Sequence, residues 1–454
     1  MPSQSVPALQ IPAGSPIASR DFLYGVATAS YQIEGAAHED GRLPCIWDTF
    51  SATPGKVAHG DTGAVACDHY HRWEADVELI ARLGVDAYRL SIAWPRVMDE
   101  KGRPNAKGLD FYKRLLDRLK KKNLQTFVTL YHWDLPQHLQ DRGGWLNRDT
   151  SYRFADYTDL MSRELDGHVD AWATLNEPWC SAFLGHGNGH HAPGLSDLRY
   201  ATQAMHHLLL GHGVALQALR ANESVSKKGL VANVGAFTPT TDSAADADAA
   251  HLGHTQHNHW VLDPLLKASY PSDLFRLWPG TEPISLEGDL KTTSQSLDFL
   301  GINYYFRTVV RADGKGGFVE TPPAGVERTA MGWEVYPQGL RDLLIGFKAR
   351  YRNLPPIYIT ENGMASDDRV VGGVVADSQR ISFLERHLQA VNEAIGAGVD
   401  VRGYFVWSLM DNFEWAYGYE KRFGITHVDY ETQLRTLKNS ALALRAFLQE
   451  RRAR

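Results

Sequence analysis

The sequence has little that would suit a secreted, membrane-bound or nucleic-acid-binding protein. Its three cysteines are odd in number and widely spaced, so they predict neither a disulfide framework nor a metal knuckle, and they favour a reducing compartment. The net charge is −6 and no basic run extends beyond residues 120–122, which argues against nucleic acid as a partner. No apolar run could span a bilayer, and the N-terminus has no signal-peptide pattern. We therefore expect a cytoplasmic protein without a membrane anchor.

Several kinds of catalytic chemistry also lack their sequence signatures. There is no Ser-His pair at a sharp elbow, no thiol nucleophile and no glycine-rich phosphate loop. Four histidines between residues 251 and 259 have metal-like spacing, but no carboxylate or thiol accompanies them in a ligand pattern. We expect no metal there or in the histidine-rich loop at residues 185–191, and no cofactor.

What the sequence does contain is an ample core and many aromatic residues. Of the 454 residues, 43% are hydrophobic, 22% are charged and twelve are tryptophan. This composition is typical of a globular protein. Tryptophan combines a large apolar face with a polar N–H group, so it suits contacts with sugar rings. Residues 1–18 are rich in Pro, Ser and Ala, and we expect them to be flexible.

Eight apolar runs of strand length recur along the chain, and helical patterns lie between them. The runs span residues 22–28, 85–92, 124–131, 169–175, 229–235, 297–304, 356–361 and 401–408. Near-continuous apolar strands alternating with helices predict a parallel sheet covered on its outer face. Eight strands close a (β/α)₈ TIM barrel, whose long strand-to-helix loops build the site. We expect one such domain over residues 19–454.

Two of the predicted strands end in a glutamate. Pro178 cannot donate to a sheet, so the fourth strand ends near Glu177; Asn362-Gly363 turns the chain directly after Glu361. A pair of carboxyl groups flanking a glycosidic bond can cleave it. The alternative, that each glutamate only caps a helix or pairs with an arginine, stays open for either residue taken alone.

The other strand ends carry polar and aromatic side chains suited to a neutral, polyhydroxylated ligand. Sugar hydroxyls donate and accept hydrogen bonds, so amides, carboxylates and imidazoles suit them. The candidates are Gln32, Arg89, His132, Asn176, Asn303, Tyr305, Trp407, Glu414 and Trp415. Asp134 and Asp411 are interpreted as residues that hold loops.

These motifs, in order, resemble those of the β-glucosidases of glycoside hydrolase family 1. The resemblance runs from about residue 20 to the end, and two motifs, at residues 174–178 and 359–363, contain the glutamates. The others lie at residues 31–35, 88–96, 131–136, 301–305, 331–334 and 407–415.

The resemblance implies a role for each matching residue. It makes Glu177 the acid/base and Glu361 the nucleophile of a retaining β-glucosidase, with Arg89 in support. Gln32, His132, Asn176, Glu414 and Trp415 match positions that bind the non-reducing sugar, and Trp407 matches the platform under it. Asn303 and Tyr305 match positions near the nucleophile, and Trp333 matches a wall on the leaving-group side. The histidine-rich loop departs from the pattern there.

Several alternatives remain open from the sequence. The same site could favour galactose or fucose over glucose, or could transfer the sugar to another sugar instead of water. A non-catalytic sugar-binding barrel would be expected to lose one of the two glutamates, and neither is missing. The expected partner is a small β-glycoside, and both a monomer and a homo-oligomer are compatible with the sequence.

Overall fold

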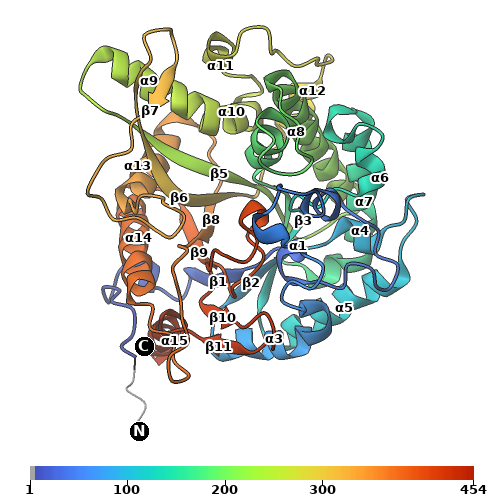
Figure 1. Ribbon diagram of the computed structural model, residues 1–454, viewed down its shortest axis with the longest axis vertical. Helices are drawn as coiled ribbons and strands as arrows, with labels where there is room; N and C mark the ends of the chain where they lie inside the picture. The colour runs from blue at the N-terminus through green and yellow to red at the C-terminus, as the bar shows by residue number, and fades with distance from the viewer. Residues whose placement is uncertain (1–5, 454) are drawn as a thin grey trace.

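The chain folds around a closed barrel of eight parallel strands with helices outside it (Figure 1). The computed structural model describes residues 6–453. The sheet runs in the order β5-β4-β3-β2-β1-β9-β8-β6, and pairing of β5 with β6 closes it. The barrel strands are β1 (Leu23–Ala27), β2 (Ala87–Ser91), β3 (Gln125–Tyr131), β4 (Ala171–Asn176), β5 (Lys227–Pro239), β6 (Phe299–Ala312), β8 (Ile357–Asn362) and β9 (Val401–Trp407). The predicted (β/α)₈ barrel is confirmed.

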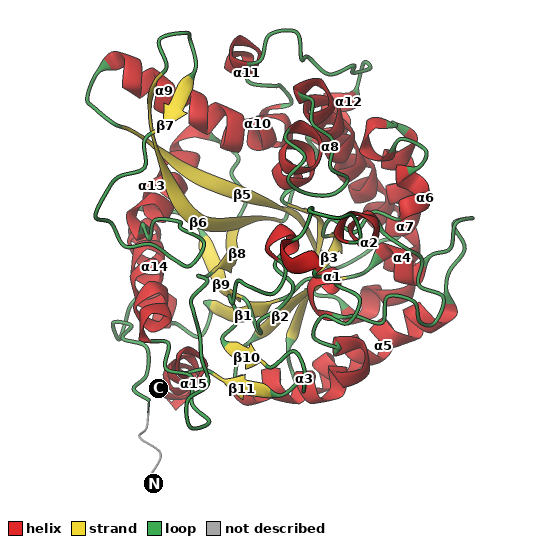
Figure 2. Cartoon of the chain, viewed as in Figure 1, coloured by secondary structure: helices red, strands yellow, loops and turns green. Residues whose placement is uncertain are grey.

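Helices follow the strands and cover the outer face of the barrel (Figure 2). The longer ones are α3 (His69–Leu83), α5 (Ala106–Lys121), α7 (Asp149–Leu165), α8 (Leu198–Ala221), α9 (Ala244–His254), α10 (Trp260–Lys267), α13 (Pro337–Arg350), α14 (Ser378–Gly396) and α15 (Asn439–Ala453). The shorter ones are α1 (Ser30–Ile33), α2 (Ile46–Ser51), α4 (Trp94–Val97), α6 (Gln137–Gln140), α11 (Ser272–Leu277) and α12 (Asp289–Thr293). In the described part of the chain, no helix is both long and apolar enough to cross a membrane.

Aromatic rings fill the interior of the barrel. Phe127 contacts Phe299, Tyr358 and Phe405 edge to face, with ring centroids 5.9, 5.2 and 4.9 Å away. Edge-to-face contacts at these distances are favourable because of the ring quadrupoles. The barrel is therefore a packed core, and any ligand site must lie above it, at one end.

Two strands are longer than the sequence predicts. β5 and β6 continue past the barrel as a two-stranded ribbon, and β7 (Phe318–Glu320) pairs antiparallel with the end of β6. The predicted fifth and sixth strands end at residues 235 and 304, close to where burial becomes partial, at residues 237 and 305, and the apolar signal fades. A small antiparallel pair, β10 (Thr426–Val428) and β11 (Arg435–Leu437), was also missed.

The predicted flexible segment at residues 1–18 falls partly outside the described residues, which begin at residue 6, and its mobility stays a prediction. In the described part, the Leu9 N–H donates to the Ala443 carbonyl, and Ile17 is buried in the single turn η1 (Pro16–Ala18).

A buried ionic cluster anchors the loop that follows β9. Lys438 is completely buried and donates to Asp368 at 2.5 Å and to Asp411 at 2.7 Å. Asp368 also pairs with Arg380, and Asp411 with Arg422. Asp411 therefore holds its loop, as predicted, and so fixes the start of the segment that carries Glu414 and Trp415.

Replacing Lys438 with methionine should destabilise the protein by about 3 kcal/mol, because removing one partner of a buried ion pair leaves uncompensated charge. Urea unfolding would measure the change. Lys121→Met, which removes an exposed lysine from its pair with Asp117, is the control and should change stability by less than about 1 kcal/mol. Equal losses in the two variants would contradict the anchoring role of the cluster.

Candidate active site

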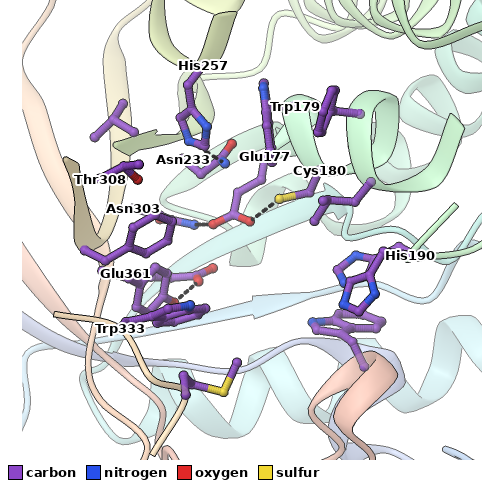
Figure 3. A pocket seen from close by; sticks show the side chains of 18 of the residues that line it. Glu177, Trp179, Cys180, His190, Asn233, His257, Asn303, Thr308, Trp333 and Glu361 are labelled. Atoms are coloured by element: carbon purple, nitrogen blue, oxygen red, sulfur yellow. Dashed lines mark hydrogen bonds between the residues drawn. The ribbon is translucent and has the colours of Figure 1, made fainter. Parts of the chain in front are cut away.

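Glu177 and Glu361 face the same cavity at the carboxyl end of the barrel. Glu177 directly follows β4, and Glu361 is the penultimate residue of β8. Both line a cavity of about 400 Å³, and their side chains point into it (Figure 3). The structure thus brings together the two glutamates that the sequence singles out.

Two hydrogen-bond donors hold Glu361. Arg89 Nη1 donates to its Oε1 at 2.5 Å, and the Tyr305 hydroxyl donates to its Oε2 at 2.6 Å. Arg89 and Glu361 are almost fully buried, so little water screens this ion pair. Each carboxylate oxygen of Glu361 thus has its own donor, which fixes the orientation of the group.

Glu177 has the opposite electrostatic surroundings. Burial, and secondarily repulsion from Glu361, raise its pKa to about 8. Asn303 Nδ2 donates to Oε1 at 2.6 Å, and Cys180 Sγ lies 3.2 Å from Oε2. Asn303 pairs with Glu361 in the sheet register, but its side-chain amide reaches across to Glu177. At neutral pH Glu177 therefore holds its proton beside the Arg89–Glu361 ion pair.

The backbone at the site is strained. Trp133, Glu177 and Trp415 have φ angles of 78°, 46° and 50°. Side chains other than glycine rarely adopt this left-handed region, and such residues cost of order 1–3 kcal/mol each. The surrounding packing holds all three, and their side chains line the cavity.

A chain of hydrogen bonds sets the orientation of Asn176 and His132. Asn176 Oδ1 accepts from Arg89 Nη2 at 2.7 Å and from Asn303 Nδ2 at 3.1 Å. Its Nδ2 must then donate to His132 Nε2, 3.0 Å away. Burial lowers the pKa of His132 well below its usual value, so the ring is neutral and its proton is on Nδ1.

The buried polar atoms without a partner among the described residues include His132 Nδ1, Gln32 Oε1 and Glu414 Oε2. Gln32 Nε2 donates to Asn412 Oδ1 and to the Phe413 carbonyl, which leaves Oε1 as an acceptor. Burial, helped by repulsion from Glu361, raises the pKa of Glu414 to about 8. Unpaired buried polar atoms are costly, so this set is suited to a ligand that carries both donors and acceptors.

Stacked aromatic rings surround these polar atoms. The His132 ring stacks on Trp407 and Trp415 at centroid distances of 6.0 and 5.9 Å. The Trp333 ring, which also lines the cavity, lies against the Tyr305 ring at a centroid distance of 5.5 Å. Nine of the twelve predicted site residues line the cavity, and Gln32, Arg89 and Asn176 are not among its lining residues.

The outer part of the cavity contains residues that the sequence analysis missed. Asn233 donates to His257 Nε2 at 3.1 Å, and Trp179 packs on the His257 ring at 4.2 Å (Figure 3). Asn233 lies on β5, near the end of a predicted strand, so the criterion that selected Asn176 could have found it. Cys180 follows Glu177 by three residues, and its sulfur lies beside the Glu177 carboxyl group.

The histidine segments lie beside the cavity without forming a metal site. His190, His191 and His257 line the cavity, and burial lowers their pKa values, so they are neutral there. His251 pairs with Asp273, and His254 bonds to the Phe237 carbonyl. Across residues 6–453, no three metal-ligating side chains are grouped to hold an ion.

Comparison with known proteins identifies the family. Residues 17–452 match the family model described as glycosyl hydrolase family 1. The chain belongs to glycosyl hydrolase family 1.

Relatives of this family 1 chain match it over nearly its whole length. The 1,4-β-D-glucan glucohydrolase of Thermotoga neapolitana is 47% identical, covering 92% of this chain and 95% of the relative. A bifunctional β-D-glucosidase/β-D-fucosidase of Bifidobacterium breve is 45% identical, covering 96% and 99%. The crystal structure of a family 1 β-glucosidase from Exiguobacterium antarcticum superposes with a TM-score of 0.93 at 45% identity, covering 96% and 99%. The chain is a glycoside hydrolase.

Replacing Glu414 with glutamine should stabilise this glycosidase at neutral and alkaline pH. The folded-state pKa, about 8, lies above the ordinary value of 4.5, so the carboxyl group costs stability progressively as pH rises from 4.5 to 8. The gain should be small at pH 4, should reach about 1–3 kcal/mol by pH 8 and should then level off. Thermal unfolding across that pH range would measure it.

Glu431→Gln is the control because Glu431 is exposed. It should show no such trend. If Glu414→Gln instead becomes less stable than wild type as the pH rises, the buried environment assigned to Glu414 is contradicted.

Proposed function

We propose that this chain is a retaining β-glucosidase that releases terminal non-reducing β-D-glucosyl residues from oligosaccharides and from aryl or alkyl glucosides. The observation that supports it most is the contrast between the two glutamates in one cavity. Glu361 is held by Arg89 and Tyr305, whereas the raised pKa of Glu177 keeps its proton. One carboxylate and one carboxylic acid are what the first step of a retaining mechanism requires.

In the first step, a Glu361 oxygen attacks the anomeric carbon and forms a glycosyl ester, while the bond to the leaving group breaks. Glu177 gives its proton to the departing oxygen. A retaining mechanism places the two carboxyl groups about 5–5.5 Å apart, because no water stands between nucleophile and sugar. Positioned acid catalysis of this kind contributes roughly 10²–10⁴-fold.

In the second step, Glu177 acts as a base. The ester at Glu361 carries no charge, so the repulsion that helped raise the pKa of Glu177 has gone, and Glu177 now ionises more readily. It takes a proton from water, and the resulting hydroxide attacks the anomeric carbon. The ester bond breaks, Glu361 regains its charge, and the sugar leaves with its original anomeric configuration.

The unpaired polar atoms of the site support a neutral glycone. Gln32 Oε1 can accept from one sugar hydroxyl, His132 Nδ1–H can donate to another, and the Glu414 carboxyl group can take part in two hydrogen bonds. Trp407 and Trp415 supply apolar surface for the ring. Among the described residues lining the cavity there is no lysine or arginine, so a phosphate group would find no cation.

A β-fucosidase activity is a second candidate. The Bifidobacterium breve relative carries both activities in its name, and it covers almost this entire chain. Transfer of the sugar to another sugar uses the same ester intermediate, with a sugar hydroxyl in place of water. We further propose a reducing, cytoplasmic location, because all three cysteines are free and buried.

The roles of the glutamates can be separated with nitrophenyl glucosides and added azide. Glu361→Gly and Glu177→Ala should each lose at least about 10²-fold in turnover. Azide should rescue both, giving an α-glucosyl azide with Glu361→Gly and a β-glucosyl azide with Glu177→Ala, because azide takes the place of the missing carboxylate in each. Product configuration by NMR checks this. Full turnover by Glu361→Gly would favour a non-enzymatic role for the site.

Phosphorylated sugars should be poor substrates. A 6-phospho-β-glucoside brings about two negative charges into a cavity that is lined by carboxyl groups, those of Glu177, Glu361 and Glu414 among them, and, among the described residues, by no lysine or arginine, so the phosphate would find no compensating cation. We expect kcat/KM to fall by at least about 100-fold relative to the plain glucoside, which corresponds to about 2.7 kcal/mol. Comparable rates on the two substrates would overturn the proposed use of Glu414.

A further inference from the structure

Cys180 contacts Glu177 directly. It begins the π-helix η5 (Cys180–Gly187), and its backbone N–H donates to the Glu177 carbonyl at 2.9 Å. Its sulfur lies 3.2 Å from Glu177 Oε2 (Figure 3). Cys180 is buried and lines the cavity beside the reacting carboxyl group. The tether through the main chain holds the thiol at this position.

The partners of Glu177 determine which of its oxygens can carry the proton. Thr360 Oγ1 donates to Asn303 Oδ1 at 2.7 Å, which directs Asn303 Nδ2 toward Glu177 Oε1. An amide N–H can only donate, so Oε1 is an acceptor whether the carboxyl group is neutral or charged. The acidic proton therefore lies on Oε2, the oxygen that faces Cys180.

The thiol remains protonated while Glu177 changes charge. Burial, followed by the negative charge of Glu177, raises the pKa of Cys180 well above its usual value. A neutral thiol is both a weak donor and a weak acceptor. It can therefore face Oε2–H as an acceptor and Oε2⁻ as a donor, and it binds neither form strongly.

We propose that Cys180 is a positioning residue that holds the proton-bearing oxygen of Glu177 through a weak, two-way hydrogen bond. In this bond the thiol accepts from the protonated oxygen and donates to the ionised one. This inference rests on the proposed role of Glu177 as the acid and base. In the first step the weak acceptor leaves the Oε2 proton free to move to the leaving group. In the second step S–H donates to Oε2⁻ and partly offsets the cost of a buried negative charge at Glu177.

Replacing Cys180 changes this hydrogen bond in two directions. Alanine removes the donor to the Glu177 carboxylate, so the alkaline limb of the kcat/KM profile should move upward by about half a pH unit or more. Serine supplies a stronger donor, and the limb should move downward by a similar amount. The pH of the alkaline limb should be highest in Cys180→Ala, intermediate in wild type and lowest in Cys180→Ser. The substrate is a phenyl glucoside, because departure of its phenol needs acid catalysis.

A buried thiol elsewhere provides the matched control. Cys45 interacts with Arg42, outside the cavity, so Cys45→Ala should leave the pH profile unchanged. Alkaline limbs that coincide in wild type, Cys180→Ala and Cys180→Ser would overturn the inference, and so would a Cys45→Ala limb that moves as far as that of Cys180→Ala.

A Glu177→Gln variant distinguishes failure of this inference from failure of the proposed function. If Glu177 is the acid, the variant loses the alkaline limb altogether, whatever the outcome for Cys180. An alkaline limb that persists in Glu177→Gln would overturn both the acid role of Glu177 and the positioning role of Cys180. A limb that disappears in Glu177→Gln but is unchanged by the Cys180 substitutions would overturn the role of Cys180 alone.

Infrared spectroscopy offers a readout that does not depend on turnover. The S–H stretching band, taken as wild type minus Cys180→Ala, should move to lower wavenumber as pH rises through the titration of Glu177, because S–H then donates to a charged oxygen. The band should stay fixed in Glu177→Gln. If the wavenumber of the wild-type S–H band does not change with pH, the two-way hydrogen bond is contradicted. This outcome counts even if Cys180→Ala or Cys180→Ser folds poorly.

Discussion

The ion pair between Arg89 and Glu361 is the interaction on which the rest of the site depends. One buried guanidinium on β2 bonds to Glu361 on β8 through Nη1 and to Asn176 on β4 through Nη2. It thereby ties together three strand ends. It also compensates one negative charge in a cavity where two further carboxyl groups have pKa values raised to about 8. Without that cation, the Tyr305 hydroxyl would be the remaining hydrogen-bond donor to the Glu361 side chain among the described residues.

A polar layer lies directly on the apolar barrel core. Phe127, Phe405 and their neighbours exclude water from below, and the layer above contains amides, an imidazole and carboxyl groups that orient one another. Hydrogen bonds in such a low-dielectric setting are stronger, and unpaired groups are more costly, than in water. The same stacking of layers therefore supports both the fixed geometry of the side chains and their affinity for a hydroxyl-rich ligand.

The barrel could be predicted from the sequence because the segments of its eight strands that lie within the barrel are short, buried and nearly continuously apolar. The two glutamates could be placed because Pro178 and Asn362-Gly363 end their strands. Three features could not be obtained in this way. The reach of Asn303 toward Glu177 depends on side-chain direction across a shifted register. The left-handed backbone at Glu177 and Trp415 is imposed by packing, and the contact of Cys180 depends on the helix that begins there.

The ribbon formed by the outer halves of β5 and β6, with β7, bounds one side of the cavity with a hydrogen-bonded ladder, and it contributes Phe237, Thr308 and Phe318 to the lining. The opposite side is formed in part by the irregular loop that carries His190 and His191. A ladder fixes backbone shape, so evolution can change the ribbon residue by residue but not easily in length, whereas the loop can gain or lose residues. Divergence among relatives at this end of the cavity would thus follow two routes: exchange of side chains on the ribbon and change of length in the loop. Both can vary without changing the residues around Glu177 and Glu361.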